Sequence, residues 1–182
     1  NGAGTVHGAT ATTDRNGMLR ETVKQIGGLT ADDVNAYVGL ERLSNRLDGG
    51  SMLEYWKSVP CFLNFTDGYK LGNRLDEALS DPTERKETKR LVAAVGGQVD
   101  WQQWRRYQPL DANNPRLRHL TEETTGAGRW QMLWLAPSLP YYKLEGPWQQ
   151  DDAQAFTKRL IFSAWAAVPK AIASLVSYDA ER

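Results

Sequence analysis

Arginine and aromatic side chains are interleaved in two neighbouring stretches of this chain, and this combination can bind nucleic acid. Guanidinium groups pair with phosphate oxygens, and aromatic rings stack on bases or sugars. The side chains concerned are Trp101, Trp104, Arg105, Arg106, Tyr107, Arg116 and Arg118. We therefore take the four arginines as candidate nucleic-acid-binding residues.

The same spacing also permits a structural interpretation. Trp101, Trp104 and Gln108 fall on one helical face, which is typical of tryptophans packed in a core. Arg105 and Arg106 then point to solvent without binding anything. Both interpretations stay open at the level of the sequence.

Other site chemistries find little support in the sequence. It contains no phosphate loop for a nucleotide, no magnesium-binding Asp-Glu pair after an apolar strand and no serine-nucleophile elbow. Cys61 with His119 is a conceivable nucleophile and base, but a lone cysteine between Pro60 and Phe62 is more typical of a small buried thiol. Adjacent carboxylates, as at positions 32–33, do not face each other on a helix. We predict no catalytic residue.

Composition narrows the class of protein. The chain has 182 residues, with 22 basic and 22 acidic side chains, so its formal net charge is zero. This balance argues against a dedicated polyanion-binding domain but leaves room for a local basic face. One cysteine and two histidines cannot supply the four ligands of a structural zinc site, so we expect no metal.

The ends and the hydropathy of the chain suggest its setting. There is no apolar run of membrane-spanning length and no signal peptide, so we expect a cytoplasmic location without membrane contact. The first residue is Asn1 rather than Met, and the last helical pattern is still running at Arg182. Both features suggest a piece of a longer protein.

Turn and capping signals divide most of the chain into short helices. Residues 1–13 are rich in Gly, Ala and Thr and are expected to be a flexible tail. Capping patterns at Thr30 and Ser51, and helix starts at Asp100 and Asn114, delimit the helices that follow. The expected helices lie within 30–48, 51–59, 69–79, 81–95, 101–107 and 114–126.

The pattern changes towards the C-terminus. Residues 130–135 are a candidate short strand, and a proline-rich connector follows. Residues 158–163 are expected to form a buried strand, and residues 166–180 a helix with Pro169 in its first turn. A strand, a turn and a helix make half of a parallel β-α-β unit. The predicted fold class is therefore mainly α, a helical region followed by a short strand and the first β-α unit of a truncated α/β lobe.

This C-terminal segment resembles a known family. Thr157–Trp165 is similar to motif IV, the opening strand of the second RecA-like lobe in superfamily-two helicases and Swi/Snf-type translocases. The continuation 166–182 resembles more closely a bacterial group of large helicase-like proteins, some associated with phage defence or carrying a phospholipase-D-like domain. Segments 134–142 and 13–19 also resemble this group. The likeness is strong over residues 130–182 and weaker over 13–75.

The resemblance implies a domain organisation. Residues 1–13 would be a tail, 14–128 the helical region between two motor lobes, 129–156 a connector and 157–182 the start of the second lobe. Motif IV lies near the nucleic-acid side of that lobe in the family. By position, Ser163, Trp165 and Lys170 become candidate nucleic-acid contacts. The alternative is that Ser163 caps the following helix and Trp165 fills the core beneath it.

The resemblance also implies partners and cofactors. The phosphate loop, the Asp-Glu box and the arginine-bearing motif of the family all lie outside this segment, so no catalytic residue is carried over. ATP and Mg²⁺ are expected for the parent protein and no cofactor for this segment. The expected partners are nucleic acid, more specifically DNA, and the rest of the helicase chain.

Three functions follow as hypotheses. The first is a fragment of an ATP-dependent helicase or nucleic-acid translocase that positions the motor lobes and is not catalytic alone. The alternative is a non-enzymatic helical module for protein–protein interaction, docking through its tryptophan-rich faces. A small hydrolase using Cys61 or the acidic pairs is the third. An open face on residues 160–163 would favour the first, and a closed sheet containing them would favour the second.

Overall fold

The computed structural model describes residues 27–132, 143–149, 153 and 159–182. Contacts divide the chain into two units, one of residues 26–125 and 161–182 and the other of residues 1–25 and 126–160. The expected tail 1–13, the similar segments 13–19 and 134–142 and most of the connector lie outside the described residues.

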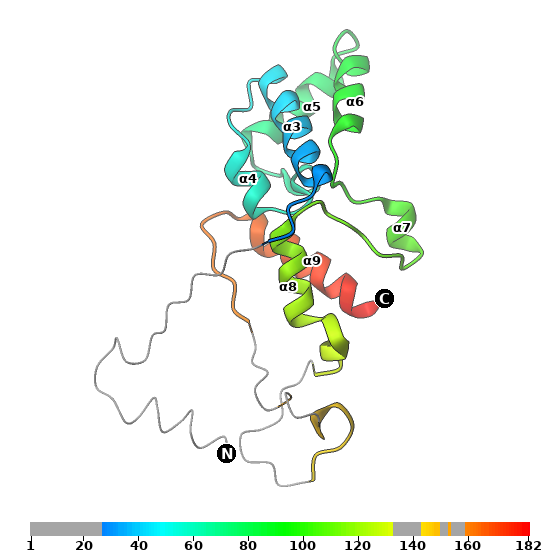
Figure 1. The fold of residues 1–182 in the computed structure, drawn as a ribbon. Helices are drawn as coiled ribbons and strands as arrows, with labels where there is room; N and C mark the ends of the chain where they lie inside the picture. Colours follow the sequence, from blue (N-terminus) through cyan, green and yellow to red (C-terminus); the bar gives the residue numbers. More distant parts are fainter. Residues whose placement is uncertain (1–26, 133–142, 150–152, 154–158) are drawn as a thin grey trace, which may run out of the picture. The chain divides into compact units, whose positions relative to one another are not determined.

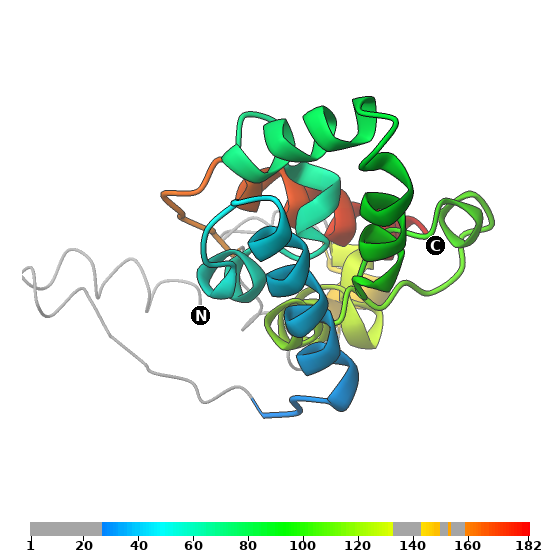
Figure 2. The same cartoon turned by 90° about the horizontal axis from the view of Figure 1, so that it is seen from above.

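The first of these units is helical, as predicted (Figures 1 and 2). Helix α3 lies against α4 and α6, α5 lies against α6, and α9 lies against η1 and α8. Its elements are α3 (Ala31–Arg46), α4 (Leu53–Ser58), the 3-10 helix η1 (Phe62–Phe65), α5 (Lys70–Ser80), α6 (Arg85–Ala94), α7 (Trp101–Arg105), α8 (Pro115–Thr124) and α9 (Ala167–Glu181).

Local capping signals explain where several of these helices begin. The Thr30 hydroxyl accepts from the Asp33 N–H at 3.2 Å, and the Asp33 carboxylate accepts from the Thr30 N–H at 2.7 Å, which confirms the predicted capping box. The caps at Asp100 and Asn114 are confirmed as well, with side chains that accept backbone N–H groups of α7 and α8.

The capping box predicted at Ser51 is wrong. Helix α4 begins at Leu53, and its N-cap residue Met52 makes no side-chain cap bond. Instead the Met52 N–H donates to the Glu41 carboxylate of α3 at 2.9 Å. A carboxylate from a neighbouring helix thus satisfies one of the free N–H groups at the start of α4.

One hydrophobic core unites the N-terminal helices with α9. Leu43 of α3 and Ala171 of α9 are fully buried, and both belong to the same cluster of packed side chains. The Ala167 N–H at the start of α9 also donates to the Tyr69 hydroxyl at 3.0 Å. Whereas the sequence places residues 157–182 at the start of a second lobe, α9 is an integral part of the helical unit's core.

The described residues contain no strand, so the finer part of the predicted fold is not seen. Residues 159–163 are irregular, and Ile161 and Phe162 are exposed rather than buried. An extended run becomes a strand only when a neighbouring strand takes its backbone hydrogen bonds, and no described segment does so here. Gly126–Met132 forms a 3-10 helix, η2, which covers the first half of the other predicted strand.

The second unit has few described residues. Its 3-10 helices η2 and η3 (Gly146–Gln149) contact each other, and Met132 and Ala153 are buried. Within the described ranges of the whole chain, no helix is both long and apolar enough to cross a membrane.

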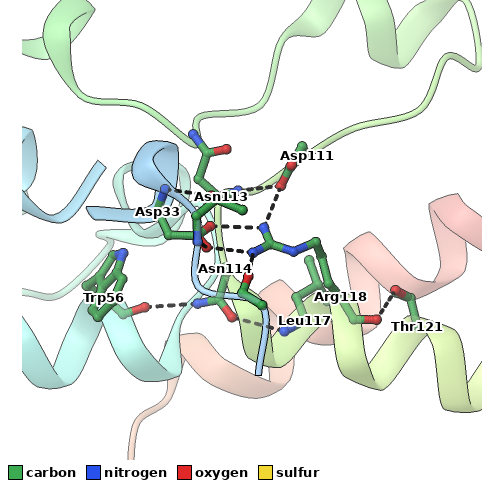
Figure 3. A network of polar contacts seen from close by, with 10 residues as sticks. Asp33, Trp56, Asp111, Asn113, Asn114, Leu117, Arg118 and Thr121 are labelled. Atoms are coloured by element: carbon green, nitrogen blue, oxygen red, sulfur yellow. Dashed lines mark hydrogen bonds and ion pairs between the residues drawn. The ribbon is translucent and has the colours of Figure 1, made fainter. Parts of the chain in front are cut away.

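A buried ion pair connects the start of α3 to α8 (Figure 3). Arg118 donates to both carboxylate oxygens of Asp33, at 2.6 and 2.9 Å, and the Asp33 side chain has no exposed surface. The same guanidinium donates to the Gly28 carbonyl at 3.0 Å and to Asp111 at 3.2 Å. Two parallel, charge-assisted hydrogen bonds of this kind pair the two charges and also fix the orientation of the two side chains relative to each other.

Asn114 extends this network from the N-terminus of α8. Its side-chain amide donates to the Trp56 carbonyl at 2.9 Å, while its oxygen accepts from the Leu117 N–H at 3.0 Å (Figure 3). The cap of α8 is therefore also a link to α4. Together with Arg118, it holds the three helices α3, α4 and α8 at fixed positions.

The ion pair predicts a loss of stability in acid. The hydrogen bonds from Arg118 hold the pKa of Asp33 below its usual value, against the opposing effect of burial. A lowered pKa adds stability above the unfolded-state value of about 4, and this stability disappears as the pH falls through the folded-state pKa.

Urea unfolding at several pH values tests this expectation. The free energy of unfolding should fall below about pH 4, and the difference between the wild type and Asp33→Asn should shrink there because the carboxylate becomes neutral. Comparison with this variant separates the contribution of Asp33 to the pH dependence from that of other carboxylates with lowered pKa values, such as Asp48 and Glu87. A difference that stays constant down to pH 2 would contradict the assignment.

Candidate nucleic-acid interface

Helix α7 lies in the loop between α6 and α8, at the edge of the helical unit in both views (Figures 1 and 2). The Asp100 carboxylate starts it by accepting from the Gln102 and Gln103 N–H groups at 2.8 and 3.3 Å. The chain leaves it through Tyr107, whose φ of 53° lies in the left-handed region. A bulky residue rarely adopts this conformation, so contacts in the rest of the fold must hold the turn after α7 in place.

Four aromatic rings from α7, the turn after it and α9 form an aromatic ladder, in the order Trp101, Trp104, Tyr178 and Tyr107. Trp104 stacks on Tyr178 with ring centroids 4.1 Å apart and an interplanar angle of 23°. Tyr107 lies nearly parallel to Tyr178 at 6.1 Å, and Trp101 meets Trp104 at 5.9 Å in a tilted arrangement. Tyr178 is thus the ring that joins α7 to α9.

Hydrogen bonds hold the ladder in place. The Tyr178 hydroxyl lies 2.6 Å from the Gln108 carbonyl oxygen and 3.2 Å from that of Gln103, and it donates to them. Burial raises the pKa of Tyr178 above its ordinary value, so the phenol keeps this proton at neutral pH. The backbone of α7 at Gln103 and the backbone of the turn after it at Gln108 are therefore attached to α9.

The two ends of the ladder are open to solvent. Trp101 is 59% exposed and Tyr107 is 58% exposed, whereas Trp104 is half-buried and Tyr178 is buried. The structural interpretation of the tryptophans therefore fails for Trp101, which does not pack in a core. A helical spacing shows which side chains share a face, but it does not show whether anything covers that face.

The candidate arginines are in three different situations. Arg105 at the end of α7 and Arg106 just after it are exposed, and neither forms an ion pair with another described residue. Arg118 is engaged by Asp33 and Asp111, so its donors already have partners. Arg116 is exposed on α8 and lines a groove to which α7 does not contribute. Arg105 and Arg106 are the candidates best placed to meet a phosphate.

The candidates taken from motif IV have local structural roles. The Ser163 hydroxyl accepts from the Trp165 N–H at 3.1 Å, which organises the turn before α9. Trp165 is half-buried and packs on Tyr55, with ring centroids 4.6 Å apart. The position of Trp165 matches the alternative interpretation, because its ring packs against the core. Ser163 does not cap α9, since the N-cap residue of that helix is Ala166 and it has no side-chain cap bond. Lys170 is exposed on the first turns of α9.

The residues of the hydrolase hypothesis are not assembled into a site. Cys61 is buried in a small cavity beside α3 and α4, while His119 lines the groove along α8. Burial raises the pKa of the Cys61 thiol to about 12, so it is protonated and a poor nucleophile at neutral pH. Among residues 27–132 and the other described segments, no three His, Cys, Asp or Glu side chains gather to hold a metal.

A groove runs along α8 in the helical unit. It has a volume of about 330 Å³ and lies between α8, α9 and the segment that precedes α9. Leu120, Ile161, Phe162 and Ile172 line it, with polar groups at Arg116, His119, Glu123 and Ser163.

Sequence reasoning missed Tyr178, the ring at the centre of the ladder. It lies in α9, more than 70 residues along the sequence from the α7 residues that it supports. No local signal identifies such a partner. Comparison with known proteins gives no further guide, because no protein-family model, no curated protein and no solved structure matches this chain.

Proposed function

We propose that this chain is the helical region between the motor lobes of an ATP-dependent helicase or nucleic-acid translocase, with the start of the second lobe. It sets the spacing of the lobes and contacts DNA, and it is not catalytic alone. The resemblance of residues 157–182 to the helicase family supports this proposal. The chain lacks a phosphate loop, so binding of ATP and Mg²⁺ belongs to the rest of the parent protein.

The observation that carries the proposal is an exposed apolar run immediately before α9. Phe162 is 87% exposed, Ile161 is 42% exposed and the preceding Leu160 is 79% exposed. Burying side chains of this size is worth about 1.5–3 kcal/mol each, so a self-sufficient domain rarely leaves three in succession in water. We therefore expect another surface to bury these three side chains, and in the proposed parent protein that surface belongs to the remainder of the second lobe.

The exposed aromatic ladder supports the contact with nucleic acid. Arg105 and Arg106 supply positive charge on α7, and Trp101 and Tyr107 supply exposed rings on either side of them. Phosphate pairing and aromatic stacking are the two interactions that proteins use to hold a strand without reading its sequence.

A helical module for protein–protein interaction is the second candidate, and the groove along α8 favours it. An amphipathic partner helix could place apolar side chains against Leu120, Ile172 and Phe162. In that case the exposed run would be covered by another protein rather than by the rest of the same chain.

Removing the apolar character of position 162 separates the two candidates. In the parent protein, Phe162→Asp should reduce DNA-stimulated ATP hydrolysis at least about tenfold, because a charge would be buried between the lobes. In the isolated 182-residue chain, the same variant should leave the melting temperature unchanged, because Phe162 is exposed. Val34→Asp, at an exposed apolar position of α3, is the matched control and should affect neither measurement.

Two results would contradict the proposal. One is ATP hydrolysis by the isolated chain, which would place a complete active site within it. The other is full ATPase activity of Phe162→Asp in the parent protein together with loss of a stable protein partner, which would establish the interaction module.

A further inference from the structure

We propose that Trp101 and Tyr107 form a stacking platform for unpaired bases, so that α7 binds single-stranded nucleic acid in preference to duplex. This inference rests on the proposed function, in which α7 contacts nucleic acid, and it specifies the form of the ligand.

The exposed rings provide the first argument. Trp101 and Tyr107 are each more than half exposed, although the rings next to them in the ladder are half-buried or buried. Large aromatic surfaces left in water beside positive charge are the feature that sequence-independent single-strand binders share. A base in a duplex already stacks on its neighbours, so only an unpaired base can offer a free face to such a ring.

The charge around the rings provides the second argument. Arg105 and Arg106 lie between Trp101 and Tyr107 in the sequence, are exposed and have no ion-pair partner among the described side chains. The nearest acidic groups in sequence are Asp100, which accepts from backbone N–H groups of α7, and Asp111, which is paired with Arg118. The positive charge is therefore available to the phosphates that link the stacked bases.

The rigidity of the platform provides the third argument. Tyr178 stacks between Trp104 and Tyr107, and its hydroxyl bonds the backbone at Gln103 and Gln108. Tyr107 is held in a left-handed conformation that a tyrosine seldom adopts. Because the fold fixes the rings before a ligand arrives, little conformational freedom is lost on stacking.

Fluorescence anisotropy on the intact 182-residue chain tests the inference. The probes are a labelled DNA strand of about 15 nucleotides, the same sequence as a duplex, and the matching RNA strand. We expect both single strands to bind at least about tenfold more tightly than the duplex, because stacking does not depend on the sugar. Binding should also quench tryptophan fluorescence.

Variants assign the effect to the platform. Trp101→Ala and Tyr107→Asn should each weaken single-strand binding about tenfold and leave duplex binding unchanged. Asparagine tolerates the left-handed φ at position 107, so the turn is preserved. Trp130→Ala, at an exposed tryptophan outside α7, is the matched control and should change neither single-strand binding nor duplex binding. The double variant Arg105→Ala/Arg106→Ala should weaken the binding of both single strand and duplex. It should also reduce the slope of the logarithm of the binding constant against the logarithm of the salt concentration by about two.

The outcomes separate the two proposals. Equal affinity for strand and duplex, with the arginine variant weakening both, would overturn the stacking platform while the contact of α7 with nucleic acid stands. An absence of binding to all three probes at about 50 mM salt would overturn the stacking platform and that contact together.

Discussion

Replacing Arg118 by alanine is expected to lower the free energy of unfolding by about 3–5 kcal/mol. The reason is that Asp33 has no exposed surface, so the variant leaves a buried carboxylate without its cation. The Gly28 carbonyl loses a donor in the same step. Urea unfolding followed by tryptophan fluorescence measures the loss.

Arg74→Ala is the matched control for this prediction. Arg74 pairs with Glu77 within one turn of α5, and both side chains are about half exposed or more, so its removal should cost no more than about 0.5 kcal/mol. Arg118→Lys should fall between the two, because a lysine keeps the charge but loses the bidentate geometry. A loss in Arg118→Ala as small as that in the control would show that the ion pair does not stabilise the fold.

Alanine at Gly97 is expected to destabilise the chain by about 2–4 kcal/mol. Gly97 has a φ of 68°, and a Cβ atom there would lie 2.5 Å from the Ala112 carbonyl oxygen. The substitution therefore combines a left-handed alanine with a collision against backbone. Because residues 97 and 112 are close to the two ends of the loop that carries α7, single-strand binding should weaken as well.

Gly50→Ala distinguishes the collision from the backbone strain. Gly50 also has a positive φ, of 89°, but a Cβ atom there would have no neighbour within 4 Å. It should cost only about 1 kcal/mol, the penalty of the left-handed conformation itself. Thermal unfolding of the two variants side by side measures the difference, and equal losses would show that the approach of Ala112 is not important.

Features set by neighbouring residues were predictable from the sequence. The caps at Thr30, Asp100 and Asn114 depend on a side chain and a backbone group two or three residues away, so a short pattern identifies them. The helical character of residues 31–124 follows from these caps and from apolar spacing.

Features that depend on distant residues were not predictable. Arg118 meets Asp33 across 85 positions, and Tyr178 meets Gln108 across 70. The expected strand at 158–163 is not seen over its described residues 159–163, for a related reason. An apolar run in the sequence favours burial, but it does not identify the neighbouring strand that would provide it. The candidate site was found in part, because the arginines and tryptophans of α7 are adjacent in sequence while the ring that supports them is not.

Helix α9 gives the two proposed contact regions a common mechanical element. Its 15 residues begin beside the exposed segment 161–163 and extend through the core, and near its end Tyr178 lies beneath Trp104. A helix of this length behaves as a stiff rod about 22 Å long. If the proposed function and the proposed stacking platform hold, a force that moves segment 161–163 would be transmitted along α9 to Tyr178 and so to the exposed rings.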